Sequence, residues 1–131
     1  MEETIFTKII NGDIPCHKIY EDEQTLAFLD IHPDNEGHTL VIPKKPVEFV
    51  WDLDSETYLA LMSTVQKVAL RLRDVLAYAY VHERVVGTDV PHAHVHLVPF
   101  DVTTQTYTPE GLSAQAEDAT LEALAARLRF E

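Results

Sequence analysis

Two stretches of the chain repeat their apolar residues every three or four positions, which is the spacing of one helix face. The longer stretch follows Asp54 and Ser55, either of which could cap a helix, and has apolar residues at 58, 62, 65, 69, 72, 76 and 79. It predicts an amphipathic helix of about 25 residues. The shorter stretch, residues 4–11, has apolar residues at 5, 6, 9 and 10 and ends at Gly12 and Pro15. It predicts a short N-terminal helix.

A third helical repeat lies near the C-terminus. Its apolar residues stand at 121, 124, 125 and 128, and basic residues follow them, as the helix dipole favours. We therefore expect a closing helix within residues 113–131. A polar linker over residues 101–112, which contains Pro109 and Gly111, would join it to the rest of the chain.

Short apolar and β-branched segments between these helices are typical of strands. We expect a hairpin from residues 18–21 and 26–31, with the polar residues 22–25 as its turn. Three more strands are expected in HTLVIP, in YVHERVVG and in HAHVHLVP. Because helices and strands do not alternate strictly, the predicted class is α+β, with an antiparallel sheet of about five strands and a long central helix.

Composition narrows the kind of protein. The 131 residues fit one domain, whose core we place in residues 1–100. The net charge of −12 repels nucleic acid and anionic membrane surfaces. Cys16 is the only cysteine, the N-terminus lacks a basic signal flank, and no apolar run approaches the roughly 20 residues of a spanning helix. We expect a cytoplasmic protein that binds neither nucleic acid nor membrane.

Three of the seven histidines stand at alternate positions in HAHVHLV, residues 92–98. In a strand, the histidines at 92, 94 and 96 share one face, and the apolar residues at 93, 95 and 97 share the other. The apolar side suits contact with the long helix, so the imidazoles are expected on an accessible surface or in a cleft. Three histidines outside any motif, His17, His32 and His82, are expected at the surface.

A metal ion is one interpretation of the histidine row. The spacing His-x-His on a strand is a known zinc geometry, but the row spans roughly 13 Å, so one ion with bonds of about 2 Å cannot easily hold both ends. Neighbouring pairs would need a further ligand. The candidates are Asp89, Asp101, His38 and His82.

Phosphoryl or nucleotidyl transfer is the other interpretation, and we favour it. Histidine titrates near neutral pH, so one ring can attack phosphorus while its neighbours donate hydrogen bonds to the phosphate oxygens. The middle histidine, His94, has a histidine on each side and is the natural nucleophile.

The row and its surroundings resemble the histidine triad family. HAHVHLV matches the family pattern, and TIFTKIINGDIPCHKIYEDEQTLAFLDIHP followed by GHTLVIPKK resembles the amino-terminal half of its members. The similarity covers residues 4–50 and 92–99 closely. It implies an α+β fold, a homodimer whose two sheets join into one, and hydrolase or transferase activity on the α-phosphate of a nucleotide.

The resemblance also implies roles for single residues. His94 would form a nucleotidyl-histidine intermediate, His96 would contact the phosphate and assist the leaving group, and His92 would position His94. His38 would be the fourth histidine, and Asp30 would bind the ribose hydroxyls. Six apolar residues would form the base pocket: Ile5, Phe6, Ile9, Phe28, Leu29 and Ile31. Without the resemblance, Asp30 suits a loop edge equally well, and these apolar residues suit the core.

Two departures from the family pattern bear on the site. Thr4 and Thr7 stand where some members have a zinc-binding Cys-x-x-Cys pair, and Pro46 or its neighbour replaces a liganding histidine. No structural zinc is therefore expected. The loop HERVVGTDVPH is shorter than usual and places Thr88 and Asp89 where neutral side chains normally face phosphate.

An ionised Asp89 would repel a phosphate. Its side chain could point away, stay protonated beside the anion, or contact an amine in the leaving group. The last arrangement would suit a phosphoramidate or aminoacyl-type substrate.

These observations predict a hydrolase that cleaves a phosphoramidate, ester or anhydride at the α-phosphate of a purine nucleoside monophosphate. The alternatives are a dinucleoside polyphosphate hydrolase and a nucleotide-binding or interaction module with little turnover. The chemistry requires no cofactor and no metal site. The expected partners are the purine nucleotide and a second copy of the chain.

Overall fold

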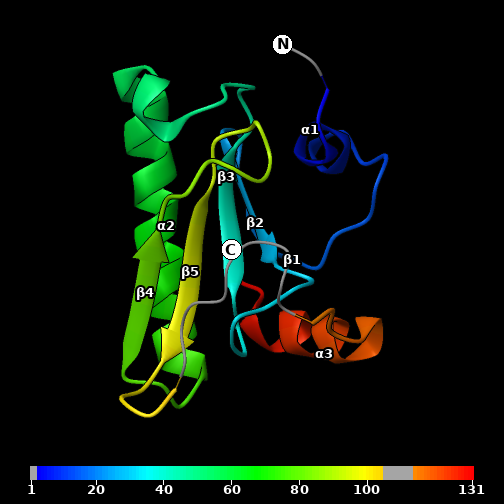
Figure 1. Cartoon of the computed structure of the whole chain (residues 1–131), viewed down its shortest axis with the longest axis vertical. Helices are drawn as coiled ribbons and strands as arrows, with labels where there is room; N and C mark the ends of the chain where they lie inside the picture. The colour runs from blue at the N-terminus through cyan, green and yellow to red at the C-terminus, as the bar shows by residue number, and fades with distance from the viewer. Residues whose placement is uncertain (1–2, 105–113) are drawn as a thin grey trace.

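A five-stranded antiparallel sheet forms the centre of the computed structural model, which describes residues 3–104 and 114–131 (Figure 1). The strands lie in the order β1-β2-β3-β5-β4. Their bounds are β1 (Lys18–Glu21), β2 (Thr25–Leu29), β3 (Thr39–Pro43), β4 (Tyr80–Arg84) and β5 (Val95–Phe100). The predicted α+β class with five strands is confirmed. None of the helices in these two ranges is long and apolar enough to cross a membrane.

The N-terminal helix α1 (Ile5–Ile10) forms where the pattern of residues 4–11 predicts it. Thr4 caps it: its hydroxyl accepts hydrogen bonds from the backbone N–H groups of Phe6 and Thr7, and the Thr7 hydroxyl in turn accepts from the backbone N–H of Thr4. This reciprocal pair satisfies N–H groups that a helix start leaves without partners. Thr4 and Thr7 therefore form the N-terminal cap of α1.

The long helix α2 (Ser55–Val75) begins at its predicted cap, Asp54, but has 21 residues. It is shorter than predicted because Leu76 already has an extended backbone. Its buried residues are Thr57, Leu61, Thr64, Val65, Val68 and Leu72. Val65 and Leu72 belong to the predicted stripe, and the other four lie one position before a predicted one. Tyr58, the first residue of the predicted stripe, is 41% exposed.

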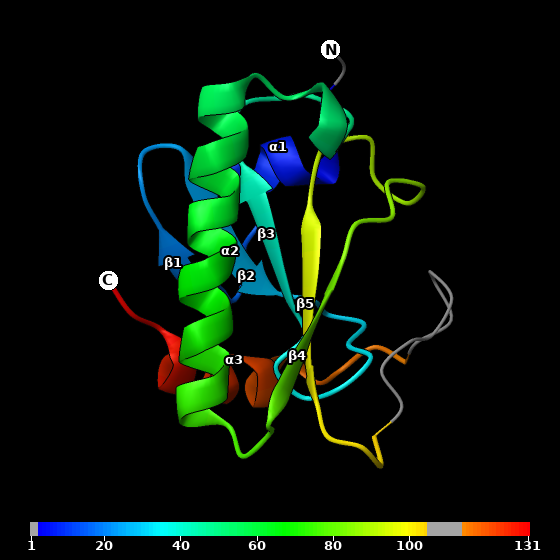
Figure 2. The same ribbon diagram turned by 90° about the vertical axis from the view of Figure 1, so that its left-hand side faces the viewer.

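The closing helix α3 (Asp118–Leu128) lies within the predicted residues 113–131 and is shorter than that range. It packs on α2 and on strands β1 and β2, beside the end of α2 that leads into β4 (Figure 2). Most of the predicted linker, residues 105–112, lies outside the described residues, and so does residue 113.

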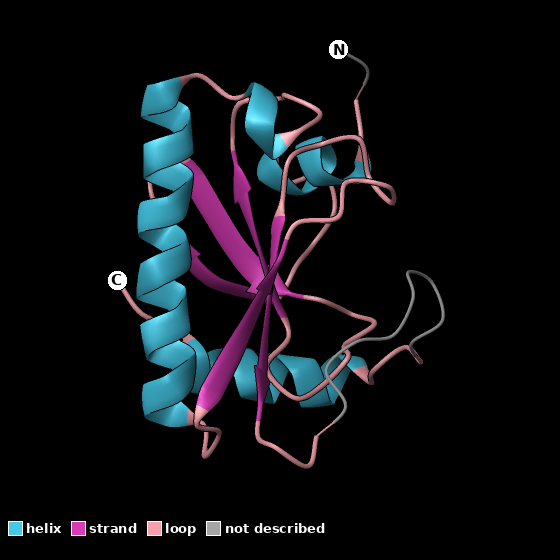
Figure 3. Cartoon of the chain, turned by 60° about the vertical axis from the view of Figure 1, so that its left-hand side comes forward, coloured by secondary structure: helices cyan, strands magenta, loops and turns pink. Residues whose placement is uncertain are grey.

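The central strands are buried on both faces, and successive residues point to opposite sides of the sheet. Figure 3 shows the long helix α2 running beside the sheet. Val41, Val95 and Leu97 join the large core under α2, as does Ala93. Leu40 and Ile42 turn the other way, to a smaller cluster with Phe6 and Phe28 under α1. The predicted contact of the apolar half of the histidine row with the long helix is confirmed.

Two strand bounds differ from the prediction in ways that affect the site. Strand β2 ends at Leu29, so Asp30 and Ile31 follow the strand. Strand β5 begins at Val95 because Ala93 bonds through its backbone N–H to the carbonyl of Val47, outside the β3–β5 ladder. His92 and His94 therefore lie on the approach to β5, and only His96 is within it.

Gly37 allows the tight turn that leads into β3. Its φ angle is +87°, and a Cβ atom there would lie 2.6 Å from Cδ1 of Leu76 and 3.1 Å from Cγ of Pro99. Both the backbone angle and the close approach favour glycine. The turn places His38 just before β3, beside β5.

Candidate active site

A cavity of about 490 Å³ opens on the α1 side of the sheet. It is lined by ten of the twelve predicted site residues: Ile5, Phe6, Ile9, Phe28, Leu29, Asp30, Ile31, His38, Asp89 and His96. The other two, His92 and His94, lie behind this lining and are buried. The expectation that all three triad imidazoles face solvent or a cleft is therefore wrong for His92 and His94, because α1 and the loop before β5 cover them.

His94 is oriented by a backbone carbonyl. Its Nδ1 donates to the carbonyl oxygen of His92 at 2.7 Å, because a carbonyl can only accept. This bond turns Nε2 of His94 toward the loop before β5, where Asp89 Oδ1 lies 2.9 Å away. The ring of Phe6 also contacts the His94 ring edge-on.

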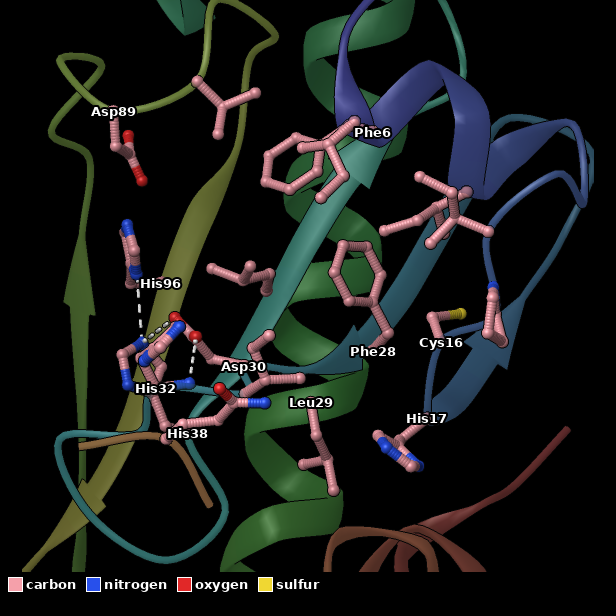
Figure 4. Close-up of a pocket in the computed structure, with 18 of the residues that line it drawn as sticks. Phe6, Cys16, His17, Phe28, Leu29, Asp30, His32, His38, Asp89 and His96 are labelled. Carbon is pink, nitrogen blue, oxygen red and sulfur yellow. Dashed lines mark hydrogen bonds and ion pairs between the residues drawn. The ribbon is translucent and has the colours of Figure 1, made fainter. Parts of the chain in front are cut away.

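His38 and His96 form a chain of hydrogen bonds with a defined direction. The backbone N–H of Asp34 donates to Nδ1 of His38, at 2.9 Å, so the proton of the neutral His38 ring is on Nε2. That Nε2–H donates to Nδ1 of His96 at 3.0 Å. In a neutral His96 ring, the proton is then on Nε2. Figure 4 shows this second nitrogen of His96 directed toward Asp89.

Burial keeps these rings neutral. It is the largest cause that lowers the pKa of His96 to about 3, and the neighbouring His94 and His38 rings add to it. Burial also lowers the pKa of His38, although the carboxylates of Asp30 and Asp34 oppose it. The pKa of His92 is lowered for the same reason, against the opposing bond to the Pro43 carbonyl. A neutral His96 can donate one hydrogen bond to a bound anion.

His92 connects the approach of β5 to strand β3. Its Nε2 donates to the carbonyl oxygen of Pro43 at 2.7 Å, and its own carbonyl accepts from His94. His92 thus bonds to His94 through its backbone carbonyl, while its ring holds the residues before β5 against strand β3.

Asp89 does not point away from the site, which excludes one of the three positions considered from the sequence. The other two positions, protonated beside the anion or in contact with an amine, depend on a bound ligand and stay predictions. In this structure its carboxylate bonds to Nε2 of His94, with the Asp89 side chain 23% exposed and the His94 side chain 1% exposed. Asp89 therefore covers Nε2 of His94, the ring nitrogen on the cavity side.

The apolar part of the cavity lies between α1 and β2. Phe6 meets Phe28 edge-on, with 5.6 Å between the ring centroids, and both are buried. Ile5 and Ile31 at the rim are 49% and 43% exposed. The apolar residues of the cavity thus include buried phenylalanines and exposed isoleucines at the rim. A flat aromatic ligand could cover the exposed isoleucines.

Asp30 lies between the apolar part of the cavity and the histidines (Figure 4). Its Oδ1 accepts from the backbone N–H of His32 at 2.8 Å, and its Oδ2 lies 3.5 Å from Nε2 of His38. The carboxylate is thus held at the end of β2, beside the cavity.

Two further features were not anticipated from the sequence. Arg84 pairs with Asp34 at 3.0 Å, and both side chains are largely buried where they line the cavity beside His38. His17 also lines the cavity, and its expected surface position is wrong. Its two ring nitrogens lie 3.0 Å from Asp118 and 2.8 Å from Glu122, so α3 covers it. His32 is exposed, as expected, and His82 is half-buried.

Two groups of side chains have the donor types and proximity of a metal site. Within the described residues these are Asp30 with His38 and His96, and Asp89 with His94 and His96; the ligand atoms in each lie within 4.8 Å of one another. However, the chain of bonds from Asp34 places protons on Nε2 of both His38 and His96. Metal binding through those nitrogens would first have to displace these protons.

Comparisons with known proteins cover most of the chain. A family model described as HIT domain matches residues 11–102. An uncharacterized HIT-like protein of Methanocaldococcus jannaschii is 43% identical over 99 residues, which are 72% of this chain and 77% of that protein. An adenosine 5'-monophosphoramidase of Schizosaccharomyces pombe is 38% identical over 99 residues, 72% of each protein.

The fold comparison extends further along the chain. A Hit-like protein from Bartonella henselae, described as involved in cell-cycle regulation, matches with a TM-score of 0.87 and 30% identity, over 97% of this chain and 94% of that one. A hypothetical histidine triad nucleotide-binding protein from Sulfolobus tokodaii has a TM-score of 0.81, also at 30% identity, over 95% and 89% of the two chains. The likeness in fold includes the elements that carry the cavity.

Proposed function

Since the chain belongs to the HIT domain family, we propose that it is a nucleotide hydrolase that acts on a purine nucleoside monophosphate derivative at its α-phosphate. The bond cleaved is a phosphoramidate, ester or anhydride. The relative named adenosine 5'-monophosphoramidase, at 38% identity, supports a phosphoramidate.

The observation that carries this proposal is the orientation of His94. Because its Nδ1 is held by the His92 carbonyl, Nε2 is the nitrogen available for attack. The His96 ring is next to it, with 5.1 Å between the ring centroids. Attack and stabilisation of the phosphate charge can therefore take place side by side.

The cavity offers a separate place for each part of a nucleotide. The base lies against the apolar side chains under α1, and Asp30 accepts hydrogen bonds from the ribose hydroxyls. The α-phosphate lies between His94 and His96, where Nε2–H of His96 donates to a phosphate oxygen. Negative charge from the phosphate favours the protonated form of His96, so burial and the anion act in opposite directions on the pKa of that ring.

The reaction has two displacements. Nε2 of His94 bonds to phosphorus while the bond from phosphorus to the leaving group breaks, and the leaving group takes up a proton. Water then attacks the nucleotidyl-histidine, the P–Nε2 bond breaks, and the nucleoside monophosphate is released. Protein groups and water supply every step, so we propose that no metal cofactor is required.

A homodimer in the cytoplasm is the proposed state of the protein. Within the described residues, strand β4 is one of the two outer strands of the sheet, with β1 at the opposite edge, and Tyr80 on β4 is 50% exposed. An outer strand of this kind can pair with a second copy. Light scattering on the purified protein should give twice the mass of the 131-residue chain.

A nucleotide-binding or interaction module with little turnover is the second candidate. The bond between Asp89 and Nε2 of His94 favours it, because attack on phosphorus requires this bond to open. The two candidates share the same cavity and differ only in whether His94 reacts.

Intact-mass spectrometry after mixing with adenosine 5'-phosphoramidate separates the candidates. We expect the His96→Ala variant to accumulate an adenylyl adduct, because loss of His96 slows its breakdown. The double variant His94→Ala/His96→Ala should show none, and Asp74→Asn, at an exposed position of α2 away from the cavity, should turn over like the wild type. Nucleotide binding without an adduct in His96→Ala, and without turnover in the wild type, would leave the binding module.

A further inference from the structure

The hydrogen bonds of His94 require one more proton than a neutral imidazole carries. Nδ1 holds one proton, which it donates to the carbonyl oxygen of His92 at 2.7 Å. Nε2 lies 2.9 Å from Asp89 Oδ1, and two lone pairs at that distance would repel each other. A second proton must therefore lie between His94 and Asp89. This proton is not available in a site that has a neutral side chain at position 89.

The position of Asp89 also defines a direction. Its Oδ1 lies where Nε2 of His94 directs its hydrogen bond, and a ring nitrogen attacks along that same direction. In an in-line displacement the phosphorus takes the place in front of the attacking nitrogen, and the leaving group lies beyond it. A carboxylate displaced outward by the incoming phosphorus would thus stand on the leaving-group side, at the cavity wall that Asp89 already lines.

We propose that Asp89 is a catalytic residue that carries the shared proton from His94 to the leaving nitrogen of the phosphoramidate. The inference rests on the proposed hydrolase function. As substrate enters, Asp89 takes the proton and Nε2 of His94 becomes an uncharged nucleophile. The P–Nε2 bond forms, the P–N bond breaks with its electron pair on nitrogen, and that nitrogen receives the proton from Asp89.

The second half of the reaction restores the starting state. Asp89, now a carboxylate, takes a proton from the attacking water while the new P–O bond forms. The P–Nε2 bond breaks with its electron pair on His94. The proton on Asp89 is again shared with Nε2, so one water is consumed and one amine and one nucleoside monophosphate are released.

The neighbouring histidines are less suited to supply this proton. His96 and His38 lie in a chain of hydrogen bonds that begins at the backbone N–H of Asp34, and each holds a single proton in that chain. Burial lowers the pKa of His96 to about 3, so its ring is neutral at pH 7. A neutral imidazole is a good hydrogen-bond donor to phosphate but a weak acid toward an amine nitrogen.

The chemistry of an amine leaving group explains the need for this proton. An amide ion is a very poor leaving group, so the P–N bond breaks readily only with proton transfer to nitrogen. The amine that leaves can also stay close to the Asp89 carboxylate as an ammonium. A polyphosphate leaving group needs no such proton, and its negative charge is repelled by the same carboxylate.

Two substrates that differ only in the need for a proton test the role of Asp89. One is the adenosine 5'-phosphoramidate of an alkylamine, and the other is adenosine 5'-(4-nitrophenyl phosphate), whose leaving group departs without protonation. For Asp89→Asn, which keeps the size of the side chain, we expect kcat on the phosphoramidate to fall about 100-fold or more, the usual effect of losing a general acid. On the nitrophenyl ester we expect less than a tenfold fall.

Asp101→Asn is the matched control, since this exposed carboxylate bonds to Thr103 and Thr104 beyond β5. It should leave both rates unchanged. Equal losses on the two substrates in Asp89→Asn would mean that Asp89 only positions His94, and no loss on either would also overturn the proton role; both results leave the hydrolase intact. If the wild type cleaves neither substrate and His94 gains no adduct, the hydrolase proposal itself fails, and the role of Asp89 with it.

Discussion

The ring of Phe6 lies edge-on against the ring of His94, with 5.2 Å between the ring centroids and 82° between the ring planes. The same phenyl ring also meets Phe28 edge-on. One side chain of α1 therefore contacts both the proposed base pocket and the proposed nucleophile. We therefore expect nucleoside binding and the placement of His94 to be coupled through this ring.

Replacing Phe6 should affect stability and catalysis together. Phe6→Ala leaves a cavity beside His94, and we expect the free energy of unfolding to fall by about 3 kcal/mol. The rate of adenylyl transfer to His94 should fall more than tenfold, because the ring loses its lateral support. Urea denaturation and single-turnover mass spectrometry measure the two effects. Phe6→Leu, which keeps most of the volume, should retain most of both; an unchanged transfer rate in Phe6→Ala would contradict the coupling.

Gly37→Ala should destabilise the turn that places His38. We expect a loss of about 2 kcal/mol in the free energy of unfolding, from backbone strain at positive φ and from contact with Leu76. Gly12→Ala is the matched control, because Gly12 has a similar φ of +83° but nothing within 4 Å of the added Cβ. A smaller loss is expected there. Equal losses in urea denaturation would show that the contact with Leu76 adds nothing.

The buried histidines should make the protein less stable in mild acid. Folded-state pKa values of His38, His92 and His96 lie below the ordinary value of 6.5, chiefly because of burial, with His96 at about 3. Below pH 6.5 the unfolded chain gains protons that the folded chain does not, so stability is complete above 6.5 and is lost as the pH falls toward 3.

The fall in stability can be measured between pH 6.5 and pH 5, before most carboxylates titrate. Each fully neutral buried histidine contributes a slope of about 1.4 kcal/mol per pH unit at most. The groups that face His38 are Asp30, Asp34, Arg84 and His82. The two carboxylates raise its pKa and moderate the slope, whereas Arg84 and His82 lower its pKa further. Urea midpoints should therefore fall with pH in the wild type and fall less in His96→Asn. The same slope in both proteins would contradict a neutral buried His96.

Removal of divalent metal should leave turnover unchanged. The proposed steps use His94, Asp89, His96 and water, so dialysis against EDTA should change kcat on an adenosine phosphoramidate by less than twofold. Added Zn²⁺ or Mg²⁺ should not increase the rate above that of the untreated protein. A loss of activity that Zn²⁺ restores would assign a catalytic metal to one of the two histidine and carboxylate groups.

Periodicity was enough to predict most of the fold. The hairpin of β1 and β2 follows from two apolar runs on either side of a polar turn, where Asp22 Oδ1 accepts from the backbone N–H groups of Gln24 and Thr25. The position of α1 follows from its apolar spacing and the residues that stop it. The end of α2 was overestimated because Leu76 continues the apolar pattern and is buried although it is no longer helical.

The parts of the site that were missed depend on residues far apart in the chain. His17 contacts Glu122, which is 105 positions away, and Arg84 contacts Asp34, 50 positions away. No local pattern marks such pairs, because their distances arise only when the sheet and α3 pack. The bond between Asp89 and His94 spans five positions, but it depends on how the loop before β5 folds back.

The alternation of β5 limits how the chain can change in length. His96 faces the cavity, while Val95 and Leu97 face α2. Each side chain of this segment is therefore suited to only one face of the sheet. A single-residue insertion or deletion between His94 and Leu97 would exchange the two sides, burying imidazole under α2 and directing aliphatic side chains into the cavity. Insertions and deletions can therefore accumulate in the loop before His92, and variation in leaving-group chemistry can arise there without disturbing the core.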